Sequence, residues 1–206
     1  MIISLLFSNP VLFLAWIIAV LMAISIHEYF HAWSAYILGD STAKDAGRLT
    51  INPLAHIDWM GLLLLMIIGI GWGKPVPVNH YNLRKSPKYG PALVSLSGAA
   101  ANLLLAVGLG ILMRFALYFH IFPQNSLGFG FLDISIQINL ILAVFNLMPI
   151  PPLDGSHILF TFLPQKYENI KLFLTQYSWA LLIGIIIFGS SLIFGIVNFL
   201  YKLIVF

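Results

Sequence analysis

The sequence opens with a stretch from Met1 to Ile26 that contains no ionisable side chain. About 20 consecutive apolar residues are enough for a helix to cross a bilayer, so this stretch constrains the chain to a membrane environment. Only 8% of all residues are charged, whereas a soluble domain carries roughly 25%. We therefore expect an integral membrane protein, which excludes an ordinary soluble domain.

Four apolar stretches predict membrane-spanning helices, at about residues 10–38, 91–119, 131–150 and 173–206. The last of these is compatible with one long helix or with two helices separated at Gly189 or Gly195. A fifth apolar stretch, at about 58–73, is too short to cross and predicts a re-entrant segment. The expected fold is an all-α polytopic membrane protein with about four to five transmembrane helices, forming one membrane-embedded domain over residues 1–206.

A proline-containing stretch, GKPVPVN, follows the re-entrant segment at residues 73–79. Pro75 and Pro77 favour an extended backbone, and Val76 and Val78 are typical strand residues. We therefore expect a short extended or β element at the membrane surface. Such an element could hold an unwound substrate by strand addition, or it could be a proline-stiffened loop.

The stretch SIHEYFHAW, residues 25–33, places His27, Glu28 and His31 near the end of the first apolar helix. Residues four apart lie on one face of a helix, so His27 and His31 can bind one metal ion. His-Glu-x-x-His is the zinc-peptidase helix, in which the glutamate is the general base acting on a metal-bound water. A cluster of histidines bonded to backbone is the alternative, but a carboxylate inside a membrane is costly and points to function.

A catalytic zinc site needs a third protein ligand and an open position for water. The chain has no cysteine, so its ligands must be nitrogen or oxygen atoms. Asp154 is a candidate because NLMPIPPLDG interrupts a membrane helix just before it, and unwound backbone at membrane depth is tolerated where it lines a cavity. Taken alone, Asp154 could equally cap the short helix that follows.

Membrane topology connects Asp154 to the two histidines. If residues 59–72 crossed the membrane, Asp154 would lie at the opposite face, whereas a re-entrant segment brings it to the same side. A shared zinc therefore requires the re-entrant segment. Most basic residues fall on that same side, namely Lys44, Arg48, Lys74, Arg84, Lys85, Lys88, Lys166 and Lys171. Such an excess marks the cytoplasmic side, and these residues are too few and scattered for a nucleic-acid surface.

The two metal motifs together resemble the site-2 protease family of intramembrane zinc metalloproteases, peptidase family M50. The second motif, Asn-x-x-Pro-x-Pro-x-Leu-Asp-Gly, runs here from Asn146 to Gly155. The blocks GRLTINPLAHIDWMG, GKPVPVN and SGAAAN extend the resemblance over about residues 20–160. Trp59 replaces the usual proline after HID, and the chain resembles a short form without a PDZ or CBS module.

The resemblance implies one Zn²⁺ per chain held by His27, His31 and Asp154, with Glu28 as the catalytic base. It also implies that Asn146 and Asn102 help to hold the substrate or the developing oxyanion. The expected reaction is hydrolysis of a peptide bond in or near the transmembrane segment of a membrane-protein substrate. The expected location is the lipid bilayer of the cell membrane, with a multi-pass chain and the active site toward the cytoplasm.

Two other functions remain open at this point. A non-catalytic zinc-binding membrane regulator would need a closed site, and the sequence offers no convincing fourth ligand. A zinc or proton transporter would need polar residues continuing across the membrane, which the first helix largely lacks. The sequence predicts neither the substrate nor the oligomeric state, and it assigns no role to His56 or Asp58.

Overall fold

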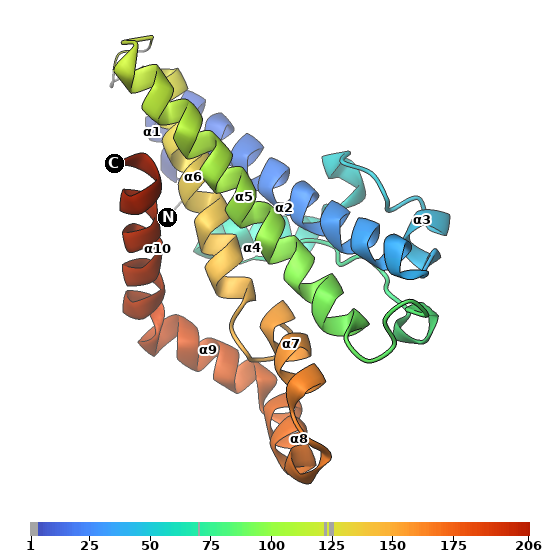
Figure 1. Ribbon diagram of the computed structural model, residues 1–206. Coiled ribbons are helices and arrows are strands. Elements are labelled where there is room, and N and C mark those ends of the chain that lie inside the picture. The colour runs from blue at the N-terminus through green and yellow to red at the C-terminus, as the bar shows by residue number, and fades with distance from the viewer. Residues whose placement is uncertain (1–3, 70, 122, 124–125) are drawn as a thin grey trace.

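Three long apolar helices form the body of the protein. The computed structural model describes residues 4–69, 71–121, 123 and 126–206. Within these ranges, α2 (Pro10–Leu38), α5 (Gly90–Tyr118) and α6 (Leu127–Asn146) are long and apolar enough to cross a membrane. They pack against one another as a bundle (Figure 1). Residues 165–176 and 178–188 form a bent pair of helices, which would be a fourth span if the two are counted as one. The predicted all-α polytopic membrane fold is confirmed.

The ends of the long helices follow local sequence signals. The Asn9 side chain accepts a hydrogen bond from the Leu12 N–H at the start of α2, and Pro10 occupies the first helical turn. Gly39 ends α2 with a φ of 110°, which favours glycine because a Cβ is strained there. The Ser126 side chain caps α6, which therefore begins before residue 131, the start expected from hydropathy.

The short helix α4 (Trp59–Ile68) lies in a segment that turns back on itself. Its ten residues rise about 15 Å, half the thickness of a bilayer core of about 30 Å. A Cβ on Gly61 would lie 2.1 Å from the Trp72 carbonyl oxygen, so the returning chain touches the start of α4. The Lys74 N–H donates to the His56 carbonyl oxygen at 2.9 Å. The two ends of this segment, His56 and Lys74, therefore lie side by side, and the chain between them runs out and back.

Irregular backbone follows this hairpin. Residues 71–79 belong to no helix or strand, so the short element expected here has no strand partner within the described chain. Pro75 and Pro77 have no N–H to donate to a neighbouring strand. The Val76 N–H instead donates to the Glu28 side chain. The remaining short elements are α1 (Ser4–Ser8), α3 (Thr42–Asp45) and the 3₁₀ turns Pro53–Ala55, His80–Asn82 and Gln165–Tyr167.

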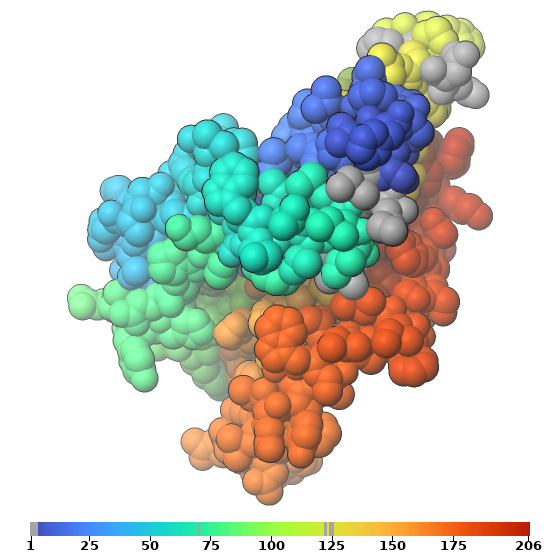
Figure 2. Space-filling model, turned by 180° about the vertical axis from the view of Figure 1, so that it is seen from behind, coloured from blue at the N-terminus to red at the C-terminus, as the bar shows by residue number. Residues whose placement is uncertain are grey.

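The C-terminal quarter, residues 154–206, contains four α-helices, and the stretch expected at 173–206 is broken rather than one long helix. They are α7 (Asp154–Phe162), α8 (Glu168–Gln176), α9 (Ser178–Phe188) and α10 (Ser190–Val205). The axis turns by 71° between residues 165–176 and α9, and a second break falls at Gly189, one of the two expected positions. Gly195 lies inside α10. Helix α10 packs on α5 and α6, whereas α8 projects from the rest of the molecule (Figures 1 and 2).

Candidate metal centre

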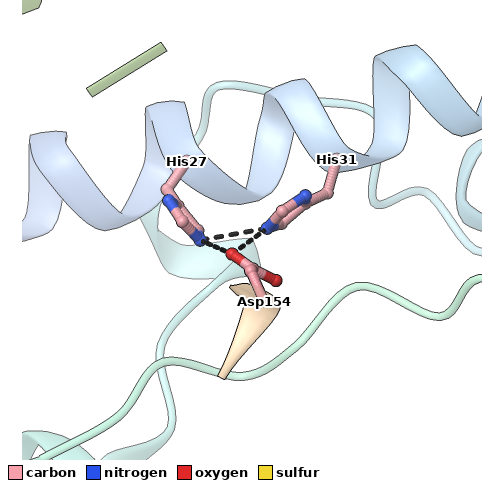
Figure 3. A group of neighbouring side chains, drawn as sticks. All are labelled: His27, His31 and Asp154. Carbon is pink, nitrogen blue, oxygen red and sulfur yellow. Dashed lines mark hydrogen bonds and ion pairs between the residues drawn. The ribbon is translucent and has the colours of Figure 1, made fainter. Parts of the chain in front are cut away.

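His27, His31 and Asp154 come together where α2 meets the first residue of α7 (Figure 3). The two histidine Nε2 atoms are 3.0 Å apart, and each lies 3.1 Å from Asp154 Oδ2. Both histidines are buried, with exposed fractions of 6% and 8%. The three residues expected to share a metal ion are therefore adjacent, although 123 positions separate His31 from Asp154.

Helix α5 fixes which nitrogen of each imidazole faces the centre. The His31 Nδ1–H donates to the Val94 carbonyl oxygen at 2.8 Å, because a carbonyl can only accept. His27 Nδ1 lies 2.7 Å from Asn102 Oδ1. The Asn102 amide nitrogen donates to the Ala23 carbonyl and to Asn139, so its oxygen faces His27. Each neutral imidazole therefore presents an Nε2 lone pair to the centre.

These contacts create a site that suits a cation. Two imidazole Nε2 atoms and a carboxylate oxygen converge at 3.0–3.1 Å, and two neutral imidazoles would direct lone pairs at the point between them. Ligand atoms in a tetrahedral zinc site lie about 3.3 Å apart, for bonds of about 2.0–2.1 Å. The residues therefore fit Zn²⁺ with small adjustments. Among the described residues no fourth histidine, cysteine or acid joins the group, which leaves a position open as a catalytic zinc requires.

Gly98 lets α5 lie directly against both histidines. A Cβ added at Gly98 would lie 2.6 Å from His31 Nε2 and 2.8 Å from His27 Cε1. Both distances are far below van der Waals contact, so no larger side chain fits without movement of the rings. The glycine of SGAAAN thus allows α5 to lie close to the two candidate metal ligands.

The three candidate ligands line a cavity of about 300 Å³ together with Glu28 and Asn146. Glu28 Oε2 accepts a hydrogen bond from the Val76 N–H at 2.8 Å. The Asn146 amide donates to the Leu142 carbonyl of its own helix, at the end of α6. The candidate base and one of the two candidate amides therefore share a cavity with the metal centre.

Asn102 does not lie in the cavity, where a residue that contacts substrate would be expected. Its side chain is fully buried behind His27 and does not line the cavity. Its amide group is bonded to His27, Ala23 and Asn139. This position does not support the expected contact with substrate, and it makes Asn102 an orienting partner of His27. Motif spacing could not reveal this, because it depends on how α5 is rotated against α2.

Two further histidines line the cavity and were not singled out from the sequence. The rings of His80 and His157 have centroids 5.6 Å apart, and both residues border the cavity. Desolvation and the neighbouring His80 hold the pKa of His157 below its usual value. The sequence signal that could have indicated His157 was its position about one helical turn after Asp154. His56 is buried, with its Nε2 bonded to the Thr50 carbonyl, and Asp58 caps α4.

Comparisons with known proteins agree with this geometry. The sequence model of "Peptidase family M50" matches residues 119–188. "Putative zinc metalloprotease YwhC" of Bacillus subtilis is 37% identical over 180 residues, which cover 85% of this chain and 80% of that protein. No solved structure matches the chain.

Two mycobacterial relatives are also similar. "Putative zinc metalloprotease Rip2" of Mycolicibacterium smegmatis is 36% identical over 66% of this chain and 52% of that protein. The protein of the same name in Mycobacterium tuberculosis is 30% identical over 89% of this chain and 71% of that protein. The chain therefore belongs to peptidase family M50, the site-2 protease family, and is a zinc metalloprotease of the membrane.

Proposed function

We propose that the protein hydrolyses a peptide bond in or near the transmembrane segment of a membrane-protein substrate. In this proposal His27, His31 and Asp154 hold one Zn²⁺, and Glu28 is the general base. The observation that carries the proposal is the convergence of three lone-pair atoms beside Glu28 in one cavity. This combination of two helical histidines, a third ligand and an adjacent glutamate is typical of zinc peptidases.

The chain's own residues divide the chemistry among them. Bound zinc would lower the pKa of a water molecule toward 7 and polarise the scissile carbonyl. Glu28 takes the proton from the attacking water and passes it to the leaving nitrogen. Asn146 lines the same cavity and helps to hold the substrate backbone. Asn102 keeps the Nε2 lone pair of His27 directed at the metal.

The depth of the centre along α2 supports a substrate within the membrane. The 29 residues of α2 rise about 44 Å, and His27 and His31 precede its last residue, Leu38, by about 10–17 Å. A scissile bond at that level lies below the membrane surface, where a transmembrane segment is the available polypeptide. Such a helix must unwind locally before its carbonyl can reach the centre, and the irregular segment 74–79 borders the cavity on one side.

The distribution of basic residues supports an active site on the cytoplasmic side. Eight of the ten lysines and arginines lie in segments that join the bundle at the end nearer the metal centre, namely Lys44, Arg48, Lys74, Arg84, Lys85, Lys88, Lys166 and Lys171. Arg114 lies toward the other end of α5 and donates to the Leu203 carbonyl near Lys202. Because cytoplasmic loops carry the excess of positive charge, we assign this end to the cytoplasmic face of the cell membrane.

Zinc content and cleavage, measured on the same set of variants, test the proposal. We expect about one zinc per purified wild-type chain and clear loss in Asp154→Ala. Asp45→Ala, an exposed aspartate on α3, is the matched control and keeps its zinc. Glu28→Gln keeps zinc but no longer cleaves a fluorogenic single-span peptide reconstituted in lipid vesicles. Wild-type zinc content in Asp154→Ala would refute the ligand set, and wild-type cleavage by Glu28→Gln would refute the role of Glu28.

A further inference from the structure

Residues 74–79, which we name the strap, pass beside the candidate base. Pro75, Val76 and Val78 line the cavity that holds the metal centre. The Val76 N–H donates to Glu28 Oε2 at 2.8 Å, which leaves Oε1 with no protein partner among the described residues. Because Pro75 and Pro77 have no N–H, Val76 supplies the first backbone donor after Lys74. One backbone atom of the strap thus fixes one oxygen of Glu28.

A buried arginine holds the first residue of the strap. Arg48 is only 8% exposed, and no carboxylate lies within ion-pair distance of it in the described chain. Its Nη2 donates to the Lys74 carbonyl oxygen at 2.6 Å, and the Lys74 N–H donates to the His56 carbonyl. Burying a cation is costly unless it is hydrogen-bonded, so the Lys74 carbonyl is an important partner for Arg48.

A buried carboxylate holds the last residue of the strap. Asp40 is fully buried, and its Oδ2 accepts from the Asn79 N–H at 2.7 Å. Its Oδ1 accepts from Thr42 and from the Asn82 amide. Burial raises the pKa of Asp40, but these hydrogen bonds outweigh burial and hold it below the usual carboxyl value. Charged groups of opposite sign therefore bind the two ends of the strap.

We propose that Arg48 and Asp40 are positioning residues for catalysis, which hold the strap so that the Val76 N–H fixes the orientation of Glu28. This inference rests on the proposed role of Glu28 as the base. A glutamate side chain has several freely rotating bonds, and a charge-assisted hydrogen bond from a fixed backbone restricts them. Restricting Oε2 keeps Oε1 available for the water, and a misplacement of about 1 Å in an active site can lower the rate about 100-fold.

Hydrogen exchange tests the contact without any substrate. Between Lys74 and Asn79 the chain has two exchangeable amides, Val76 and Val78, and within the described chain only the first is hydrogen-bonded. In the zinc-loaded protein, Val76 should exchange about 10- to 100-fold more slowly than Val78, as expected for a hydrogen bond to a charged group. Glu28→Ala should remove the difference. Equal exchange rates in the wild type, or a slow Val76 amide in Glu28→Ala, would overturn the inference.

Two proline substitutions test the consequence for catalysis. Val76→Pro deletes the donor to Glu28, and Val78→Pro deletes the neighbouring unbonded N–H in the same proline context. With the fluorogenic single-span peptide, Val76→Pro should lower kcat about 10- to 100-fold while KM and zinc content stay near wild type. Val78 also lines the cavity, so Val78→Pro is the reference for an added proline, and the kcat of Val76→Pro should lie well below that of Val78→Pro. Equal kcat values for the two variants would overturn the inference.

If Val76→Pro does not fold, substitution of Asp40, which holds the last residue of the strap, tests the positioning role instead. Asp40→Asn keeps the shape of the side chain but removes its charge, so the strap should loosen, Val76 should exchange faster and kcat should fall. Unchanged exchange and kcat in Asp40→Asn would refute the positioning role. Two results distinguish failure of this inference from failure of the proposed function. Wild-type cleavage by Glu28→Gln would refute the role of Glu28 as the base. Loss of cleavage in Glu28→Gln, together with equal exchange rates at Val76 and Val78 in the wild type, would refute only the role of the strap.

Discussion

Replacing Gly98 by alanine should displace the candidate metal ligands His27 and His31. The added Cβ would lie 2.6 Å from both Cε1 and Nε2 of His31 and 2.8 Å from His27 Cε1. Carbon atoms in contact normally lie about 3.5–4.0 Å apart, so the rings and α5 must separate by about 1 Å. The rings cannot simply turn away, because Val94 and Asn102 of the same helix hold their Nδ1 atoms. Separation therefore breaks these hydrogen bonds or distorts the ligand geometry.

The size of the effect follows from that geometry. Loss of the groups that orient metal-bound histidines typically lowers metal affinity about 10- to 100-fold, and we expect this range for Gly98→Ala. Overpacking costs about 1–3 kcal/mol of folding free energy, and the higher helix propensity of alanine returns about 1 kcal/mol. The protein should therefore still fold while its zinc affinity falls.

Gly108→Ala is the matched control for this substitution. Gly108 lies on the same helix, and a Cβ there would meet nothing within 4 Å. The gain in helix propensity is the same for both variants, so the difference in their zinc affinities reports only the contact of the added Cβ with the histidines. Zinc affinity would be measured for both in detergent micelles by competition with a chelator. Equal affinities for Gly98→Ala and Gly108→Ala would refute the reasoning.

Three more predictions concern the amide chain behind His27, the metal itself and the strap. Asn139→Ala leaves the Asn102 amide without one of its acceptors, so zinc affinity should fall about 10-fold by chelator competition; unchanged affinity would count against an orienting role. Removal of zinc with EDTA should stop cleavage and lower the Tm, and added zinc should restore both. The hydrogen bonds that depress the Asp40 pKa in the folded state stabilise the protein above its unfolded-state pKa of about 3.9. This contribution is lost as the pH falls through the folded-state pKa, so the Tm of Asp40→Asn should depend less on pH in the acid range than the Tm of the wild type. The same dependence of Tm on pH in both proteins would contradict this prediction.

The candidate metal ligands could be identified from the sequence because local rules place them. His27 and His31 are four residues apart in a helix whose apolar composition and N-cap are readable, so their common face follows from helix geometry. Asp154 needed an additional argument about topology. The short length of the segment around α4 supplied it, and the return of Lys74 to His56 is the contact that the argument required.

Other features depend on contacts that the sequence does not encode locally. The rotation of α5 against α2 decides that Asn102 faces His27 rather than the cavity. The path of the strap decides that the Val76 N–H meets Glu28. The bend before α9 was missed because hydropathy alone reads 173–206 as a continuous apolar stretch, although the chain turns by 71° there.

The separation of the ligands along the chain has a consequence for biosynthesis. Asp154 follows His31 by 123 positions, and synthesis at about 5–20 residues per second places about 6–25 s between them. During this interval a nascent chain carries Glu28 and both histidines but not the third ligand. A newly made chain therefore lacks the complete candidate centre until Asp154, the first residue of α7, has been synthesised.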